Sequence, residues 1–332
     1  MRNKTILLAM PPSNGIVDLI AKNLQFHGYE VFRVDSILDF EYASIKDRIS
    51  NFFIKHALRN NNYKEKLKAK QCLNKAELLI GNKQYDYTIV IRPDLYPKSV
   101  LEMLKQQTKI KFIGYQWDGL KRFPVINLIH LFDKFYIFDH TDIINKEYKK
   151  YHLHKTTNFY FDMLTPQNIK NDVMQAYYIG DHQTCRVQAI EQCITNLTAN
   201  GIKTKFIIPT SKRKDINCYQ SKHIIFGKEN RINYFENLKN VNSSDILVDF
   251  VVGGHHGLSF RHFEALYYQK KLITTNIYVK NYDFYHPENI YIWEDKTHND
   301  IKDFLKEPFK PIKAEIFQKY SFKNWIEQIL YS

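Results

Sequence analysis

Short apolar runs alternate with amphipathic segments from the start of the chain. The run Thr5–Met10 is followed by P-P-S-N-G, by apolar residues at helical spacing up to Gly28, and by a second apolar run, Glu30–Val34. Apolar runs of this length are typical of buried strands, and the periodic segment between them is typical of a helix that ends at a glycine. The pattern predicts a βαβ unit of the doubly wound kind.

The first half continues with further strands and helices. Tyr42–Leu79 is rich in Lys and Asn with apolar residues at helical intervals, which predicts one or two solvated amphipathic helices. Apolar runs at Tyr87–Ile91, Lys111–Tyr115 and Lys134–Phe138 predict further strands. Strands that alternate with helices indicate a mostly parallel sheet.

The βα pattern starts afresh after a polar segment, Asp162–Asp172, where we place the domain boundary. A helix is expected over Thr184–Asn200, and a last helix, Phe322–Tyr331, carries apolar residues at i, i+3, i+4 and i+7. The other predicted elements of this half are strands, at Ala176–Ile179, Lys205–Ile208, His223–Phe226, Ile246–Phe250, Lys271–Thr274 and Ile290–Ile292.

These elements predict an α/β fold of two Rossmann-like, doubly wound domains that face a central cleft. We assign residues 1–165 to an acceptor-side domain and residues 172–314 to a nucleotide-binding domain, with the C-terminal helix, about 315–332, packing back on the first. Ligands of such sheets bind in the crevice at the carboxyl ends of the strands. The chemistry is therefore expected there.

Size and composition agree with two domains. At 332 residues the chain is long enough for two ordinary cores. No apolar run approaches the roughly 20 residues that cross a bilayer, and Thr5–Met10 is too short for a signal peptide, so we expect a cytoplasmic protein. The four cysteines match neither a zinc spacing nor a disulfide framework and are expected to be free thiols.

The formal net charge of +13 indicates anionic partners, whether nucleic acid, anionic lipid or phosphorylated small molecules. The basic residues are spread along the chain and no RNP, KH or helix-turn-helix pattern is present, so nucleic acid is not expected. The Lys-rich segment Arg59–Lys75 is either a solvated helix face or a contact with an anionic membrane surface.

Gly253–Asn276 is the most informative stretch. A predicted strand runs into a glycine-rich turn, and a helix begins near Ser259. Glycines allow close approach to a diphosphate, and a helix start favours an anion. Arg261 can donate to phosphate oxygens, and Glu264 can accept from ribose hydroxyls. The alternatives are structural: glycines for the turn, Ser259 as an N-cap, and Arg261 paired with Glu264 on the helix.

This stretch resembles the donor-binding motif of GT-B glycosyltransferases, and the chain is most similar to the spore-maturation-like transferases of lipopolysaccharide and capsule biosynthesis. Tyr178–His182 with Arg186, and Asn230–Leu238, fit the same resemblance. The resemblance implies that Glu264 holds the ribose of a nucleotide sugar. It also implies further donor-binding residues, namely Gly180, Asp181, Arg186, Ile232, Asn233, Gly257, Leu258, Ser259 and Arg261.

The catalytic base is less clearly marked. Asp118 follows a predicted strand in Tyr115–Gly119 and is our candidate for the base of an inverting transferase, although it could equally cap the turn. His256 is the second candidate, with His140 and Asp181 as further alternatives. His256 stands eight residues before Glu264, where many GT-B enzymes have a carboxylate, and this departure argues against a retaining mechanism built on that carboxylate. The sequence does not otherwise decide between inverting and retaining. The acceptor is expected near Ser13, Asn14, Gly15 and Trp117.

No metal and no cofactor are expected. His255 and His256 are adjacent and so point in different directions, without a carboxylate at ligand spacing. The resulting hypothesis is a cytoplasmic glycosyltransferase, either free or peripheral on the inner face of the plasma membrane, that moves a sugar from a nucleotide-sugar donor to a bacterial surface glycan. The alternatives are a nucleotide-sugar-binding protein without catalysis and a basic nucleic-acid-binding protein.

Overall fold

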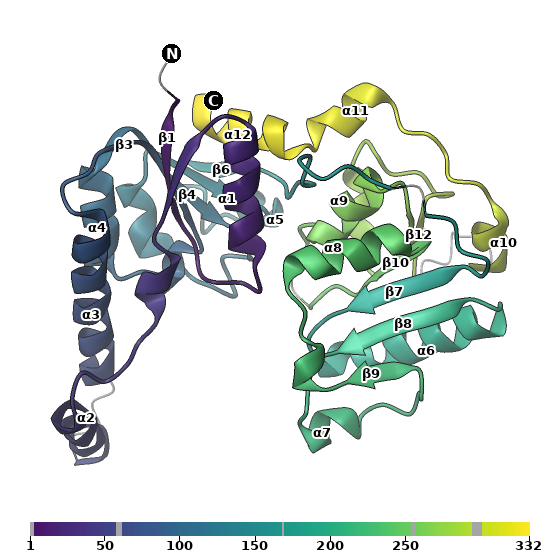
Figure 1. The fold of residues 1–332 in the computed structure, drawn as a ribbon, viewed down its shortest axis with the longest axis horizontal. Helices are drawn as coiled ribbons and strands as arrows, with labels where there is room; N and C mark the ends of the chain where they lie inside the picture. Colours follow the sequence, from purple (N-terminus) through teal and green to yellow (C-terminus); the bar gives the residue numbers. More distant parts are fainter. Residues whose placement is uncertain (1–2, 58–61, 168, 254–255, 294–300) are drawn as a thin grey trace. The chain divides into compact units, whose positions relative to one another are not determined.

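The computed structural model describes residues 3–57, 62–167, 169–253, 256–293 and 301–332. By its internal contacts the chain divides into two compact units (Figure 1). The first unit comprises Met1–Ser13, Ile20–Ile137 and Asp142–Lys155, and the second comprises Asn14–Leu19, Phe138–Thr141 and Thr156–Ser332.

The sheet of the first unit has six parallel strands in the order β2-β1-β3-β4-β5-β6. The strands are β1 (Thr5–Ala9), β2 (Glu30–Arg33), β3 (Tyr85–Ile91), β4 (Thr108–Gln116), β5 (Lys134–Ile137) and β6 (Leu153–Lys155). The first five were predicted from the sequence. The edge strand β6 was missed because its three residues, L-H-K, carry no run of apolar side chains.

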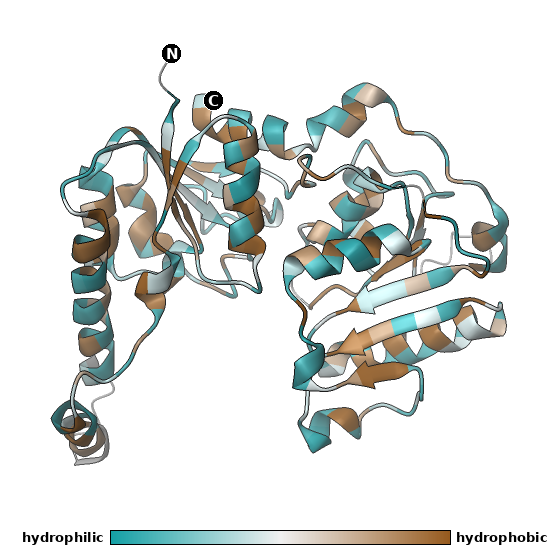
Figure 2. Ribbon diagram, viewed as in Figure 1, coloured by the Kyte–Doolittle hydropathy of each residue, from teal (hydrophilic) through white to brown (hydrophobic). Residues whose placement is uncertain are grey.

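The helices of this half include two in the Lys- and Asn-rich region, α2 (Ile45–Ala57) and α3 (Asn62–Ile80), as predicted. Figure 2 shows hydrophilic and hydrophobic residues mixed along α3. The others are α1 (Ile16–Phe26), α4 (Lys98–Gln106), α5 (Thr141–Ile144) and the 3₁₀ turns η1 (Asp35–Leu38), η2 (Pro93–Leu95) and η3 (Ile126–Leu131).

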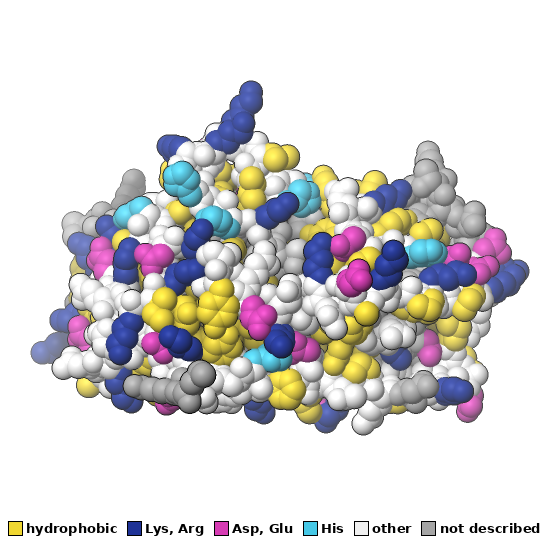
Figure 3. Space-filling model, turned by 90° about the horizontal axis from the view of Figure 1, so that it is seen from above, with side chains coloured by type: hydrophobic (Ala, Val, Ile, Leu, Met, Phe, Trp, Pro, Cys, Tyr) yellow, Lys and Arg dark blue, Asp and Glu magenta, His cyan; other side chains and the backbone are white. Residues whose placement is uncertain are grey.

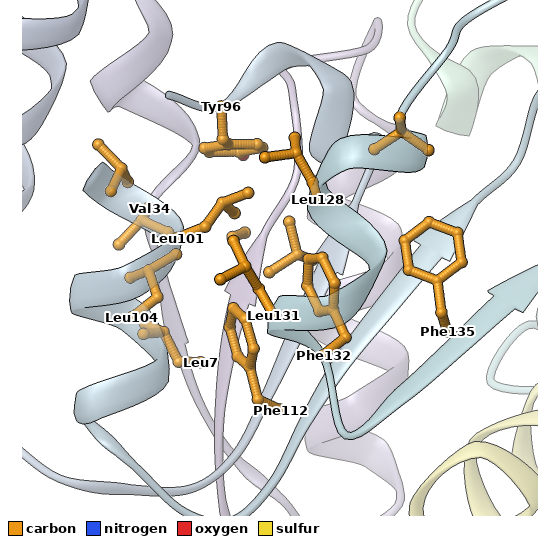
Figure 4. Packing of buried hydrophobic residues seen from close by; sticks show 14 of the residues in the cluster. Leu7, Val34, Tyr96, Leu101, Leu104, Phe112, Leu128, Leu131, Phe132 and Phe135 are labelled. Carbon is orange, nitrogen blue, oxygen red and sulfur yellow. The ribbon is translucent and has the colours of Figure 1, made fainter. Parts of the chain in front are cut away.

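The core of the first unit forms where helices cover the sheet. Buried residues of β1, α4, β4 and η3 pack together, and Phe112 stacks on Phe132 with ring centroids 4.6 Å apart (Figure 4). Gly114 lies beside these rings, and a Cβ there would stand 2.6 Å from the ring of Phe135. The close packing therefore requires a glycine in the middle of β4.

The second unit also has six parallel strands, in the order β12-β11-β10-β7-β8-β9. They are β7 (Gln175–Ile179), β8 (Lys203–Ile208), β9 (Ile224–Phe226), β10 (Ile246–Asp249), β11 (Lys271–Thr274) and β12 (Ile290–Ile292). All six were predicted within a few residues. Chain order reverses between β7 and β10, and such a reversal is where doubly wound sheets open a ligand-binding crevice at the carboxyl ends of the strands.

The helices of the second half include α6 (Val187–Ala199), which was predicted from its apolar stripe. The others are α7 (Arg213–Ile216), α8 (Tyr234–Ser243), α9 (Phe260–Tyr267), α10 (Ile301–Lys306), α11 (Ala314–Lys319), α12 (Phe322–Tyr331) and the 3₁₀ turns η4 (Thr184–Arg186), η5 (Lys228–Asn230) and η6 (Ile277–Asn281).

The last helix, α12, packs on aromatic side chains of the second unit. Phe159 contacts Phe322 edge-on at 4.8 Å and Trp325 at 4.4 Å between ring centroids. The N–H of Phe322 donates to the carbonyl of Tyr160 at 3.0 Å. The predicted apolar stripe of this helix is buried, as expected. Within the described residues, no helix is long and apolar enough to cross a membrane.

Candidate functional site

A pocket of about 350 Å³ lies at the carboxyl ends of β7 and β10 in the second unit, at the reversal of strand order. Gly180 follows β7, and Asp249 ends β10. The pocket also takes in the start of α9 and the segment before α8. Its lining consists of Asn14, Tyr178, Ile179, Gly180, Asp181, Arg186, Pro209, Arg231, Ile232, Tyr234, Asn237, Val248, Asp249, Phe250, Ser259, Phe260, Arg261 and Glu264.

Most of the residues that the sequence assigned to donor binding surround this one pocket. The residues that line it are Gly180, Asp181, Arg186, Ile232, Ser259, Arg261 and Glu264. Three others are not among its lining residues. Asn233 caps α8 and accepts from the N–H of Glu236 at 2.9 Å, Leu258 is buried in the core, and Gly257 lies in the turn before α9.

Glu264 lies on α9 with only 4% of its side chain exposed. Its Oε1 accepts from the hydroxyl of Tyr234 at 2.5 Å and from Nδ2 of Asn237 at 3.2 Å, and its Oε2 accepts from Nη1 of Arg261 at 2.7 Å. A carboxylate has about four acceptor positions. These three bonds therefore fix the carboxylate at the pocket wall and leave acceptor capacity for a further hydroxyl.

Arg261 pairs with Glu264 one turn along α9, the arrangement that the sequence left as an alternative to phosphate binding. Nη2 also donates to Oδ1 of Asn237 at 3.2 Å, and the guanidinium lies 5.2 Å from the ring centre of Tyr177. Burial alone would lower the pKa of Arg261, but Glu264 and the other acidic groups around it raise that pKa. Arg261 therefore stays charged beside the pocket.

Two further arginines line the pocket. Arg231 pairs with Asp181 at 2.5 Å, and both side chains are exposed. Arg186 is half-buried at the start of α6, and its Nε lies 3.5 Å from the carbonyl of Val251. Because this hydrogen bond is to a neutral carbonyl, Arg186 can turn its charge to an anionic ligand at little cost.

A buried hydroxyl also faces the pocket. Tyr178 lines it, is 3% exposed, and has a hydroxyl without a hydrogen-bond partner in the part of the chain that the structure describes. A Cβ at Gly180 would stand 2.4 Å from this hydroxyl. Gly180 therefore makes room for the Tyr178 hydroxyl, which a ligand in the pocket could satisfy.

Side-chain contacts hold the turn before α9 in place. Ser259 occupies the N-cap position but makes no capping bond, and its hydroxyl donates to Oδ1 of Asp249 at 2.7 Å. Gly257 packs under the ring of Phe138, which a Cβ would approach to 2.3 Å. The carbonyl of Leu258 accepts from Nδ2 of Asn158 at 2.9 Å. Gly257 thus serves close packing.

His256 and Asp139 form a second cluster of the second unit. Oδ2 of Asp139 accepts from the backbone N–H of His256 at 3.0 Å and lies 3.3 Å from its Nδ1, and the hydroxyl of Thr141 lies 3.0 Å from the same nitrogen. Burial would raise the pKa of Asp139, but hydrogen bonds from Thr141 and His256 outweigh it and lower that pKa. Asp139 is 2% exposed and the His256 side chain is 32% exposed, so a buried anion orients an accessible imidazole.

Asp118 lies in the first unit, after β4. Its Oδ2 accepts from Nη1 of Arg92 at 3.0 Å, and Arg92 also holds Asp94 through two bonds of 2.8 Å each. Asp94 and Asp118 raise the pKa of Arg92 against the effect of burial. The predicted base is therefore held by an ion pair with the guanidinium of Arg92.

The residues assigned to the acceptor are divided between the units. Ser13 and Trp117 belong to the first unit, and the hydroxyl of Ser13 donates to the carbonyl of Pro11 at 3.2 Å. Asn14 and Gly15 belong to the second and both have positive φ, 47° and 81°. The carbonyl of Asn14 accepts from the N–H of Tyr234 at 2.6 Å, which brings Asn14 to the pocket wall.

The described residues contain no group of three or more His, Cys, Asp or Glu side chains that could hold a metal ion. His255, which the sequence analysis considered together with His256 as a metal ligand, lies outside the described residues. All four cysteines are free, as predicted.

Sequence reasoning missed several residues that build these clusters. Tyr234 and Asn237 hold Glu264, and Asp249 holds Ser259. Asp249 could have been singled out as a carboxylate at the end of a predicted strand, whereas Asp139 lies 117 positions from His256 and no spacing connects them.

Comparisons with known proteins agree with the fold. No protein-family description and no curated protein sequence matches the chain. Among solved structures, it is similar to a glycosyltransferase from Rickettsia africae ESF-5, with 12% identity, a TM-score of 0.55, and coverage of 100% of both chains. It is also similar to the apo form of the lipopolysaccharide outer core galactosyltransferase WaaB, with 11% identity, a TM-score of 0.50, and coverage of 97% of both chains. The chain therefore has the two-sheet α/β fold of GT-B glycosyltransferases, as the sequence predicted.

Proposed function

We propose that this protein is a glycosyltransferase that takes a sugar from a nucleotide-sugar donor. The observation that carries the proposal is the pocket at the strand-order reversal of the second unit, which combines a fixed carboxylate, Glu264, with the guanidinium groups of Arg186, Arg231 and Arg261. A nucleoside diphosphate needs this combination, because its ribose hydroxyls donate to a carboxylate and its phosphates attract cations.

In the proposed complex, Glu264 accepts from a ribose hydroxyl and Arg186 turns from the Val251 carbonyl to the diphosphate. The backbone beside Ile232 borders the base, and the Tyr178 hydroxyl gains a partner. The leaving diphosphate is then neutralised by guanidinium groups, without a metal ion or other cofactor.

We place the catalytic base at His256. It stands three residues before Ser259, which lines the pocket, and Asp139 and Thr141 orient its Nδ1. The base removes the proton of the acceptor hydroxyl while the hydroxyl oxygen attacks the anomeric carbon and the nucleoside diphosphate departs. Asp118, which pairs with Arg92, is the alternative base.

For the acceptor we propose a bacterial surface glycan such as a lipopolysaccharide or capsule precursor, on the cytoplasmic face of the membrane. The likeness to a lipopolysaccharide galactosyltransferase supports this choice. So does the surface of α2, where Ile45, Ile49, Phe52 and Phe53 are each more than half exposed. Lys46 and Arg48 lie on the same helix, so it can contact anionic lipid. Residues 59–61 of the Lys-rich segment lie outside the described residues.

The test measures binding and transfer separately. Unfolding temperature is recorded with a panel of nucleoside mono- and diphosphates, because a ligand stabilises the folded protein by mass action. The best ligand then defines the labelled nucleotide sugar for a transfer assay with glycan acceptors. Arg186→Ala should weaken nucleotide binding about tenfold or more. The matched control Arg213→Ala removes an exposed arginine of α7 that does not line the pocket and should change nothing.

His256→Gln should leave nucleotide binding intact and lower turnover by about 10² to 10⁴. If nucleotides bind but no labelled sugar is transferred or hydrolysed, the protein is a nucleotide-sugar sensor and the enzymatic proposal is wrong. If no nucleotide raises the unfolding temperature, the donor pocket itself is wrongly assigned.

A further inference from the structure

A second cavity, of about 530 Å³, lies in the first unit, and the proposed function does not use it. It opens at the amino ends of two strands, because Lys134 begins β5 and His152 directly precedes β6. In a parallel sheet all the amino ends of the strands lie on one side and all the carboxyl ends on the other. The cavity therefore lies at the opposite end of the strands from Asp118, which follows the carboxyl end of β4.

The lining of this cavity is strongly basic. Asp133 is the acidic residue among the lining residues, and its Oδ2 already accepts from the N–H of Phe112 at 2.7 Å. The cavity is lined by Ile129, His130, Phe132, Asp133, Lys134, Phe135, Lys150, Tyr151, His152 and His154.

The basic groups lie close enough to affect one another. Burial lowers the pKa of His154, and the charges of Lys134, His152 and Lys111 lower it further. Burial and Lys134 also lower the pKa of Lys111, against the opposite effect of Asp133. Positive charges gathered in this way repel one another, and a bound anion would remove that repulsion.

The histidines do not point to a metal. Among the described residues no set of His, Cys, Asp and Glu could hold a metal ion, although His130, His152 and His154 line one cavity. The aromatic residues Phe132, Phe135 and Tyr151 add apolar surface to the lining, and Lys150 lies 5.2 Å from the ring centre of Tyr151. A cavity of this volume accommodates a small organic molecule.

We propose that this cavity binds a phosphorylated ligand, with Lys134, His152 and His154 around the phosphate and Tyr151 beside its organic part. Two oxygens of a phosphate can then accept from different N–H donors, and the third faces Lys150 or solvent. The phosphate can belong to a soluble phosphate ester or to a phospholipid headgroup. Figure 3 shows His and Lys or Arg side chains close together on the part of the surface that the first unit forms.

Inorganic pyrophosphate is the first probe, followed through the imidazole resonances of the full-length protein. We expect those of His152 and His154 to shift on titration, a readout that is local to this cavity and independent of the donor pocket. Lys134→Ala should weaken the response about tenfold or more. His152→Gln changes an exposed side chain and should also weaken it, which covers the case that Lys134→Ala fails to fold. Unmoved His152 and His154 resonances overturn the proposal.

Lys149→Ala is the matched control, because Lys149 is exposed in the same segment and does not line the cavity. If it weakens binding as much as Lys134→Ala, only general charge attraction is present and the proposal fails.

Glycerol phosphate and vesicles of phosphatidylcholine with or without phosphatidic acid then distinguish a soluble phosphate ester from a phospholipid headgroup. A response to glycerol phosphate that depends on Lys134 supports a soluble ligand, and vesicle binding that depends on Lys134 supports a lipid headgroup. The absence of any Lys134-dependent response overturns both.

Discussion

The ion pair of Arg261 and Glu264 allows a test of whether Glu264 stabilises the folded protein in addition to its proposed role in ligand binding. Glu264→Ala leaves the guanidinium of Arg261, whose side chain is 10% exposed, without its carboxylate. It also removes the acceptor for the Tyr234 hydroxyl and for Nδ2 of Asn237. Breaking one side of a buried pair costs about 3–5 kcal/mol.

We therefore expect the urea midpoint of the second unit's unfolding to fall by about 1–2 M, taking an m-value of about 2–3 kcal/mol per M. The double variant Arg261→Met/Glu264→Leu removes both charges and keeps similar volume. Since such replacements are often close to neutral, the double variant should be more stable than Glu264→Ala alone.

The measurement is urea unfolding without nucleotide, followed by far-ultraviolet circular dichroism. A urea midpoint for Glu264→Ala within about 0.3 M of the parent protein would refute the reasoning. The free energy of unfolding would then have fallen by much less than the loss of a buried ion pair predicts. The reasoning would also be refuted if the double variant lost as much stability as the single variants Arg261→Met and Glu264→Leu lose when their losses are added.

Three further predictions concern packing and pH. Gly257→Ala should destabilise the protein by about 1–3 kcal/mol, since its Cβ would meet the ring of Phe138. Gly253→Ala should be neutral, because a Cβ there has no atom of the described, non-adjacent residues within 4 Å; equal urea midpoints for the two variants would contradict this. Gly180→Ala should be destabilising beside the hydroxyl of Tyr178 and should recover only in part in the Gly180→Ala/Tyr178→Phe double variant, because the Cβ would still lie 2.9 Å from the ring carbon Cζ; a double-mutant cycle measures this coupling. The lowered pKa of Asp139 means that its carboxylate adds stability above its ordinary pKa, about 4, and loses it as the pH falls through the depressed value. The stability difference between the parent and Asp139→Asn should therefore be largest near neutral pH and shrink at about pH 3, and a difference that grew on acidification would be inconsistent with it.

Most strands of the two sheets could be predicted because they appear in the sequence as short runs of apolar residues. The strand β10 and the Gly-rich turn after it are visible in the same way, and so is the stripe of α12. β6 escaped prediction because its side chains are only half-buried or exposed and its pairing to β5 depends on the backbone.

The candidate site could be predicted only where it is local in sequence. Ser259, Arg261 and Glu264 share one turn and one helix, so their proximity follows from helical spacing. By contrast, the sequence does not reveal that the ring of Phe138, more than a hundred residues away, packs against Gly257. Likewise, the pairing of Asp118 with Arg92 depends on the register of β3 and β4. Spacing along the chain does not encode such contacts.

The division of the chain has a consequence for any attempt to produce the second unit alone. This unit takes Asn14–Leu19 and Phe138–Thr141 from within the sequence of the first. A fragment that began at Thr156 would lack the ring that covers Gly257 and the carboxylate that orients His256. In such a fragment, Gly257 and His256 would lose these contacts. Cleavage of the chain just before Thr156, followed by separation of the two pieces, should therefore inactivate the protein.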